Sequence, residues 1–297
     1  MVQENLYRFR NGWAGVAVFV ALLFGWSLTI QASTTQNATA PGAFDHGHSL
    51  LTQVLQKHVK MEGPASTVAY GRLKEDSGDL DRYLSQLEKV TLDEFQTYSR
   101  NEQLAFLINA YNAYTVKLIL DHYPLKSIKD IGSPWKKKFF TLFGKERHLD
   151  DVEHGMIRQD RDSGFFSKSP FESLEKPLQE ALKPFNEPRI HFAVNCASIG
   201  CPALMDEAFV ASKVNSQLKE ATRLFLQDKT RNIFDADEME LRLSKIFDWY
   251  GKDFEKASGS VQEFVAPVMG SNPEEVKKIR ATKKISFLDY DWGLNEH

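Results

Sequence analysis

The amino-acid sequence predicts an α+β fold: a predominantly helical single domain with a small antiparallel sheet, preceded by an N-terminal signal or anchor segment. Apolar residues recur at helical spacing along much of the chain, whereas a few short alternating segments are bounded by turn residues. The chain has 297 residues, which is long enough to bury a hydrophobic core without disulfides or metal ions. These observations favour one large globular domain.

The first 45 residues differ in composition from the rest of the chain. Two arginines precede an apolar run over residues 13–30, and small and polar residues follow it. This is the order of a secretory signal peptide, although about 18 apolar residues also approach the length that spans a bilayer. We therefore expect residues 1–32 to be a signal peptide or an uncleaved N-terminal anchor, residues 33–45 a flexible linker, and residues 46–297 a single globular domain.

Export and composition narrow the expected partners. Either N-terminal alternative carries the domain out of the cytoplasm, so we expect a periplasmic or secreted protein. Positive and negative residues are intermixed and the formal charge is −3, so no nucleic-acid partner is predicted. We expect no membrane contact beyond an N-terminal anchor, an unknown small-molecule or peptide substrate, and no cofactor.

In the first half of the chain, apolar spacing predicts helices over residues 48–58, 80–90, 100–122 and 171–183, and Thr91 should cap another. The helix over residues 100–122 has little polar face, so it should be buried nearly all round. Alternation predicts a strand over residues 66–73 and a hairpin around Gly144-Lys145. Asp150 or Asp151 should cap a short helix on which His154 has Asp150 and Arg158 as neighbours one turn away.

In the second half, the predicted helices cover residues 205–227, 245–254, 261–269 and 273–279. The predicted strands cover residues 232–234, 238–244 and 284–295. Since a terminal strand usually docks onto a sheet, the last of these should pair with the others.

The segment over residues 188–202 concentrates the chemistry of the chain. It holds both cysteines, Cys196 and Cys201, together with His191, Asn195 and Ser198. Two thiols in an oxidising compartment tend to pair, and the five-residue spacing allows a tight disulfide-linked turn. The segment is therefore either a site with a reactive thiol or a turn held by a disulfide.

Two amides stand out inside the apolar helix over residues 100–122. Asn109 and Asn112 are one turn apart, so they lie on the same face. A buried amide needs hydrogen-bond partners. We expect these side chains to tie the helix to a neighbouring loop, or one of them to point into a site as an orienting group.

The chain resembles the domain of unknown function 547 family. Five ordered motifs carry the resemblance: Asn109-Ala-Tyr-Asn112, Leu149-Asp-Asp-Val-Glu-His154, Arg189 to Pro202, Phe247-Asp-Trp-Tyr-Gly-Lys-Asp-Phe254 and Tyr290-Asp-Trp-Gly-Leu-Asn295. Together they extend over roughly residues 95–295. The family name implies no activity, and the resemblance indicates an exported, stand-alone bacterial member.

One hypothesis for the site is a cysteine-dependent hydrolase or transferase with Cys196 as the nucleophile. His154 is the preferred base, and Glu153, Asp150 or Asn112 would orient it. Asn195 or the Cys196 backbone N–H would stabilise an oxyanion. His191 is the second choice of base, because on a strand or a helix it would face away from Cys196.

The alternatives are a disulfide between Cys196 and Cys201, either structural or redox-active, and a non-enzymatic exported binding domain. A metal site built from His154, His191, Glu153 and Cys196 is disfavoured, because adjacent residues on a helix do not face one ion. The aromatic residues around Trp249 and Trp292 are expected to belong to the core.

Overall fold

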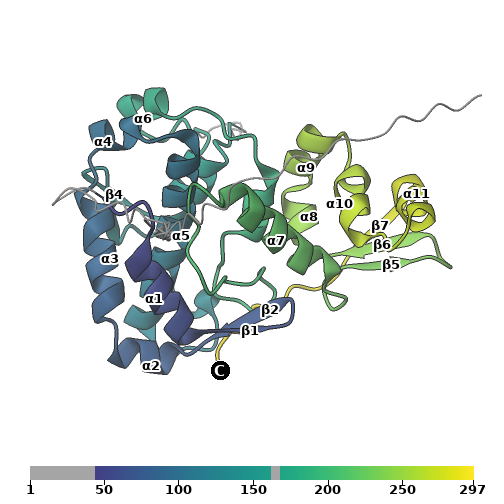
Figure 1. Cartoon of the computed structure of the whole chain (residues 1–297), viewed down its shortest axis with the longest axis horizontal. Coiled ribbons are helices and arrows are strands. Elements are labelled where there is room, and N and C mark those ends of the chain that lie inside the picture. Colours follow the sequence, from purple (N-terminus) through teal and green to yellow (C-terminus); the bar gives the residue numbers. More distant parts are fainter. Residues whose placement is uncertain (1–43, 162–167) are drawn as a thin grey trace, which may run out of the picture. The chain divides into compact units, whose positions relative to one another are not determined.

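The computed structural model describes residues 44–161 and 168–297 (Figure 1). The predicted signal or anchor segment, residues 1–32, and most of the predicted linker lie outside these ranges. Within them, no helix combines the length and apolar character that a membrane crossing requires.

The fold class is α+β, as predicted, with about half of the structure helical and with small sheets. The α-helices are α1 (Ser49–His58), α2 (Tyr70–Glu75), α3 (Gly78–Lys89), α4 (Leu92–Thr97), α5 (Arg100–His122), α6 (Lys176–Ala181), α7 (Val214–Gln227), α8 (Ile246–Trp249), α9 (Gly251–Ser258), α10 (Val261–Met269) and α11 (Pro273–Ala281). Three short helices of other types are the 3₁₀ helices η1 (Ile128–Asp130) and η3 (Pro188–Phe192) and the π-helix η2 (Asp151–Ile157).

The strands of the described residues form three small sheets. They are β1 (Val59–Glu62), β2 (Ala65–Val68), β3 (Phe140–Leu142), β4 (Lys145–Arg147), β5 (Ile233–Asp235), β6 (Glu240–Leu243) and β7 (Lys284–Phe287). β1–β2 and β3–β4 are antiparallel hairpins, whereas β6 pairs antiparallel with β5 and parallel with β7. The third sheet is therefore mixed, because helices α8 to α11 intervene before β7 and form the long crossover that a parallel pairing needs.

Helix α5 is the centre of a first hydrophobic cluster, and its predicted burial on all sides is confirmed. Ser99 caps it: the Ser99 hydroxyl accepts from the Glu102 N–H, and the Glu102 carboxylate accepts from the Ser99 N–H. A second cluster consists of side chains from η3, β6 and α7 to α11. Figure 1 shows α8 to α11 grouped with the third sheet.

Several predicted elements are confirmed in position. Helices α1, α3, α5 and α10 and the hairpin around Gly144 lie where the apolar pattern and the turn residues placed them. The turn residues Phe143 and Gly144 both have positive φ, of 55° and 70°, as a two-residue hairpin turn requires.

Other elements are shorter than predicted, because local pattern does not show where tertiary contacts hold the backbone. The helix predicted over residues 205–227 begins only at α7, since Asn109 and Gln217 bind the backbone of the preceding loop. The strand predicted over residues 66–73 ends at Val68, and α2 follows. The prediction for residues 284–295 is right for β7 alone, and the remaining residues form only isolated bridges.

Two further helix predictions also change. The helix predicted over residues 171–183 reduces to α6, in which Pro177 occupies the first turn. The helix predicted over residues 245–254 divides at Tyr250 into α8 and α9.

Candidate functional site

A cavity of about 470 Å³ lies where the two hydrophobic clusters meet; we call it the central cavity. Much of its wall is aromatic, with Tyr111, Trp135, Trp249, Tyr250, Tyr290 and Trp292. The reactive side chains on the wall are Asp150, Glu153, His154, His191, Cys196 and Cys201. Three of the predicted catalytic residues, Cys196, His154 and Glu153, therefore line one cavity, although they come from different segments.

Cys196 and Cys201 form a disulfide across the turn, with their Cα atoms 6.3 Å apart. The disulfide, one of the two alternatives for this segment, is thus present. Cys201 is buried, whereas Cys196 is half-buried on the wall of the cavity. Cys196 is therefore the more exposed of the two residues of the bridge.

Hydrogen-bond donors converge on the sulfur of Cys201. The Cys196 backbone N–H lies 2.9 Å from Cys201 Sγ, and the Tyr290 hydroxyl lies 3.1 Å from Cys201 Sγ and 3.2 Å from Cys196 Sγ. Burial raises the pKa of Tyr290 well above its usual range, so its hydroxyl keeps its proton. Because a thiolate accepts hydrogen bonds better than a disulfide sulfur, both donors stabilise Cys201 once the bridge opens.

Two amides fix the backbone around the bridge. Asn112 donates to the Ala193 carbonyl and accepts from the Asn195 N–H, both at 2.9 Å. Asn195 in turn accepts from the Ala197 N–H and donates to the Pro202 carbonyl. Neither amide lines the central cavity, so their contacts give Asn112 and Asn195 a positioning role and not the orienting and oxyanion roles predicted for them.

Asn109 repeats this arrangement one turn earlier on α5. Its side chain donates to the Phe209 carbonyl at 2.7 Å and accepts from the Phe209 N–H at 2.9 Å. The prediction that these amides tie the helix to neighbouring loops is confirmed for both.

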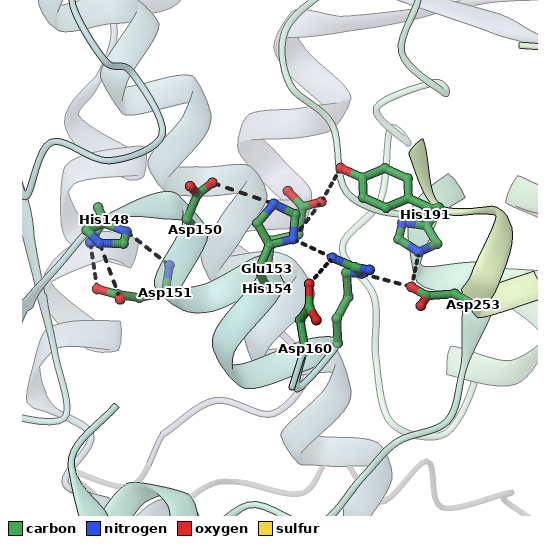
Figure 2. A network of polar contacts seen from close by, with 10 residues as sticks. His148, Asp150, Asp151, Glu153, His154, Asp160, His191 and Asp253 are labelled. Carbon is green, nitrogen blue, oxygen red and sulfur yellow. Dashed lines mark hydrogen bonds and ion pairs between the residues drawn. The ribbon is translucent and has the colours of Figure 1, made fainter. Parts of the chain in front are cut away.

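Asp150, Glu153, His154 and His191 on the cavity wall belong to a network of acids and imidazoles (Figure 2). His154 Nδ1 lies 2.9 Å from Arg158 Nη1, and His154 Nε2 lies 3.7 Å from Asp150 Oδ1. A guanidinium only donates, so we assign Nδ1 as the acceptor and place the proton on Nε2. Both nitrogens of His154 therefore face charged partners.

Glu153 is a buried carboxylate beside His154. The Tyr250 hydroxyl donates to its Oε1 at 3.1 Å, and His154 Nδ1 lies 3.8 Å from the same oxygen. Burial acts to raise the pKa of Glu153, but the neighbouring His154, a hydrogen bond from Tyr111 and the charge of Arg158 outweigh it and hold the pKa below its usual value. Glu153 is therefore ionised at neutral pH. Burial raises the pKa of Asp150 instead.

His191 pairs with an acid that sequence reasoning did not select. His191 Nε2 lies 2.8 Å from Asp253 Oδ2, and Arg158 Nε donates to the same oxygen at 2.8 Å. The His191 ring stacks on Tyr250, with centroids 4.0 Å apart and planes 14° apart. The expectation that His191 and Cys196 face apart is wrong, because a 3₁₀ turn brings both onto the cavity wall. Asp253 lies in the motif over residues 247–254, and its place in that motif could have marked it as a candidate site residue.

Residues 95–226 match the family model described as protein of unknown function, DUF547. The chain therefore carries a DUF547 region over these residues. The matched region holds the motifs of α5, η2 and the cysteine turn, whereas those around Trp249 and Trp292 lie beyond it. No curated protein and no solved structure matches the chain.

In this DUF547 protein, the aromatic part of the wall comes mainly from outside the matched region. Trp249 packs on Tyr290 and Trp292, with ring centroids 4.9 and 5.8 Å apart, and Trp135 meets Trp292 at 5.7 Å. Trp249 is 45 % exposed, so the expectation that it belongs to the core is wrong. The DUF547 name assigns no activity, and the function must be argued from the cavity.

Proposed function

We propose that this DUF547 protein carries out thiol–disulfide exchange in the central cavity, with the Cys196–Cys201 bridge as the reacting group. The observation that carries the proposal is the convergence of two donors on Cys201 Sγ beside Cys196, the more exposed of the two residues. A leaving thiol departs faster when its thiolate is stabilised. A bridge that only fastened a turn would need neither the cavity nor the donors.

The proposed reaction takes two electrons from a substrate that carries two thiols. One substrate thiol loses its proton as its sulfur attacks Cys196 Sγ, the bond between the two cysteine sulfurs breaks, and Cys201 leaves as a thiolate. The second substrate thiol then attacks the substrate sulfur of the mixed disulfide and releases Cys196. The products are an oxidised substrate with its own disulfide and the protein with two thiols, so atoms and electrons balance.

The proposal includes export of the domain to a periplasmic or extracellular compartment. Such compartments are oxidising, so the bridge would be the resting form there. The substrate would be a small molecule or a peptide whose dithiol fits a cavity of about 470 Å³.

A cysteine-dependent hydrolase or transferase is the second candidate. Its support is that Cys196, Glu153 and His154 line the same cavity. The contacts of His154 weigh against it as a base, because Arg158 and Asp150 face its two nitrogens. This activity would also require the bridge to be reduced first.

The test is a redox titration of the native protein in glutathione buffers, followed by alkylation of free thiols and mass spectrometry. We expect the bridge to open without unfolding, at a potential above the roughly −300 mV typical of structural disulfides. We also expect stoichiometric oxidation of a peptide with two cysteines, lost in Cys196→Ser. A bridge that resists reduction while the protein stays folded would contradict the proposal.

A further inference from the structure

One residue that lines the central cavity has a side-chain nitrogen without a hydrogen-bond partner. Nδ1 of His191 is buried and unpaired, and His191 is 2 % exposed. Buried polar atoms are nearly always paired, so an exception needs a specific explanation. Among the described residues with such an unpaired atom, His191 is the one that lines the central cavity.

The contacts of His191 decide which nitrogen carries its proton. Burial acts to raise the pKa of Asp253, but the hydrogen bonds from His191 and Arg158 hold that pKa well below its usual range. Asp253 is therefore an ionised acceptor, and His191 Nε2 is the donor to it. Nδ1 is left as an unprotonated lone pair, which is the arrangement of an acid-oriented general base.

The surroundings of His191 hold the ring in this state. It stacks on Tyr250 and contacts Phe254 with centroids 5.5 Å apart. The charged and titratable groups that face it are Asp253, Arg158, Glu153 and Tyr250. Burial, together with Arg158, lowers the pKa of His191 against the opposing effect of both carboxylates, so the ring is neutral at pH 7.

We propose that His191 Nδ1 takes the proton from the substrate thiol as that thiol attacks Cys196 Sγ, with Asp253 as the positioning residue. The inference rests on the proposed function. In this step the substrate S–H bond breaks, an N–H bond forms on His191, and a bond forms between the substrate sulfur and Cys196 Sγ. The bond to Cys201 breaks, and His191 then returns the proton to the Cys201 thiolate.

The pH dependence of bridge opening distinguishes this step from unassisted exchange. We would measure the rate at which dithiothreitol opens the native bridge between pH 6 and 8. The reaction would be quenched with an alkylating agent, and the modified protein would be quantified by mass spectrometry. Without a base, the rate should rise about 100-fold over this range, because the reactive thiolate fraction rises tenfold per pH unit below the thiol pKa. With His191 as the base, the wild-type rate should change by less than about threefold.

Two substitutions should restore the steep dependence. In His191→Gln the amide can still donate to Asp253 but offers no base. In Asp253→Asn the side-chain amide can donate to Nε2, which moves the imidazole proton to Nδ1 and removes the free lone pair. Both should therefore show about 100-fold variation between pH 6 and 8, as expected for unassisted thiolate attack.

His58 offers a matched control. It is also a buried histidine with an unpaired Nδ1 and an acid, Asp76, 3.5 Å from its Nε2, but it lies outside the central cavity. His58→Gln should keep the flat wild-type profile.

The outcomes are distinguishable. A bridge that dithiothreitol cannot open in the folded protein overturns both this inference and the proposed function. A wild-type bridge that opens about 100-fold faster at pH 8 than at pH 6 overturns the inference alone. If the two variants fail to fold, the wild-type protein still decides. A rate that is independent of pH and falls at least twofold in D₂O supports proton transfer to a base. A rate that rises steeply with pH contradicts it.

Discussion

The central cavity has two unlike walls. The sulfur wall, Cys196 and Cys201, is fixed by uncharged groups: backbone N–H groups, the Tyr290 hydroxyl and the Asn112 amide. The acid wall, which consists of Glu153, His154 and His191, is held by contacts with Arg158 and Asp253, two residues that do not line the cavity themselves. A change of redox state should therefore alter the contacts of the sulfur wall, whereas a change of pH should alter the charges of the acid wall. In the proposed reaction, proton transfer connects the two walls.

Arg158 is the residue whose loss should affect the acid wall most. Arg158→Met leaves Asp253 without its guanidinium partner, and removing one member of this half-buried ion pair should lower the free energy of unfolding by about 1–3 kcal/mol, between the values for exposed and buried pairs. Urea unfolding measures this change. Arg223→Met, which breaks an exposed pair with Glu220, should cost less than about 1 kcal/mol. Equal effects of the two substitutions would mean that the acid wall is not held by charge.

Asn109 and Asn112 both hold a neighbouring loop through a side-chain amide, so they can be compared directly. Asn109→Ala and Asn112→Ala each leave a buried backbone N–H and carbonyl unpaired, so each should lower the free energy of unfolding by about 2–3 kcal/mol. Only Asn112 touches the segment that holds the bridge. The reduction potential should therefore shift in Asn112→Ala and stay constant in Asn109→Ala. A shift of similar size in both variants would show that Asn112 does not position the bridge.

Tyr290→Phe removes the hydroxyl that lies near Cys201 Sγ and changes the shape of the side chain little. Loss of a donor to a thiolate destabilises the reduced form by about 1.5–3 kcal/mol, which corresponds to a potential about 30–60 mV more negative. Titration in glutathione buffers measures the shift. An unchanged potential would exclude Tyr290 from stabilising Cys201.

Lowering the pH should reduce the free energy of unfolding because of His191. Its folded pKa is lowered by burial, so neutral His191 stabilises the protein above the unfolded pKa of about 6.5, and this contribution is lost as the pH falls below that value. Between pH 7 and 5.5 the wild type should therefore lose more of its free energy of unfolding than His191→Gln. Unfolding by urea at the two pH values provides the measurement, and parallel losses would argue against a neutral buried imidazole.

The local residue pattern was enough to predict part of the fold and part of the site. The apolar run of α5, its two amides and the turn at Gly144 follow from spacing and turn chemistry within a few residues. The same holds for the contact between His154 and Arg158, which lie one helical turn apart.

The sequence by itself placed the two cysteines within reach of a disulfide, because five residues and a tight turn separate them, but it left a free reactive thiol as the other alternative. Only the tertiary structure decided what surrounds that bridge. Tyr290 reaches the sulfur of Cys201 from 89 residues away, and Asp253 reaches His191 from 62 residues away. Contacts over such separations depend on how helices and loops pack, whereas residue spacing constrains only the neighbours within a turn or a strand.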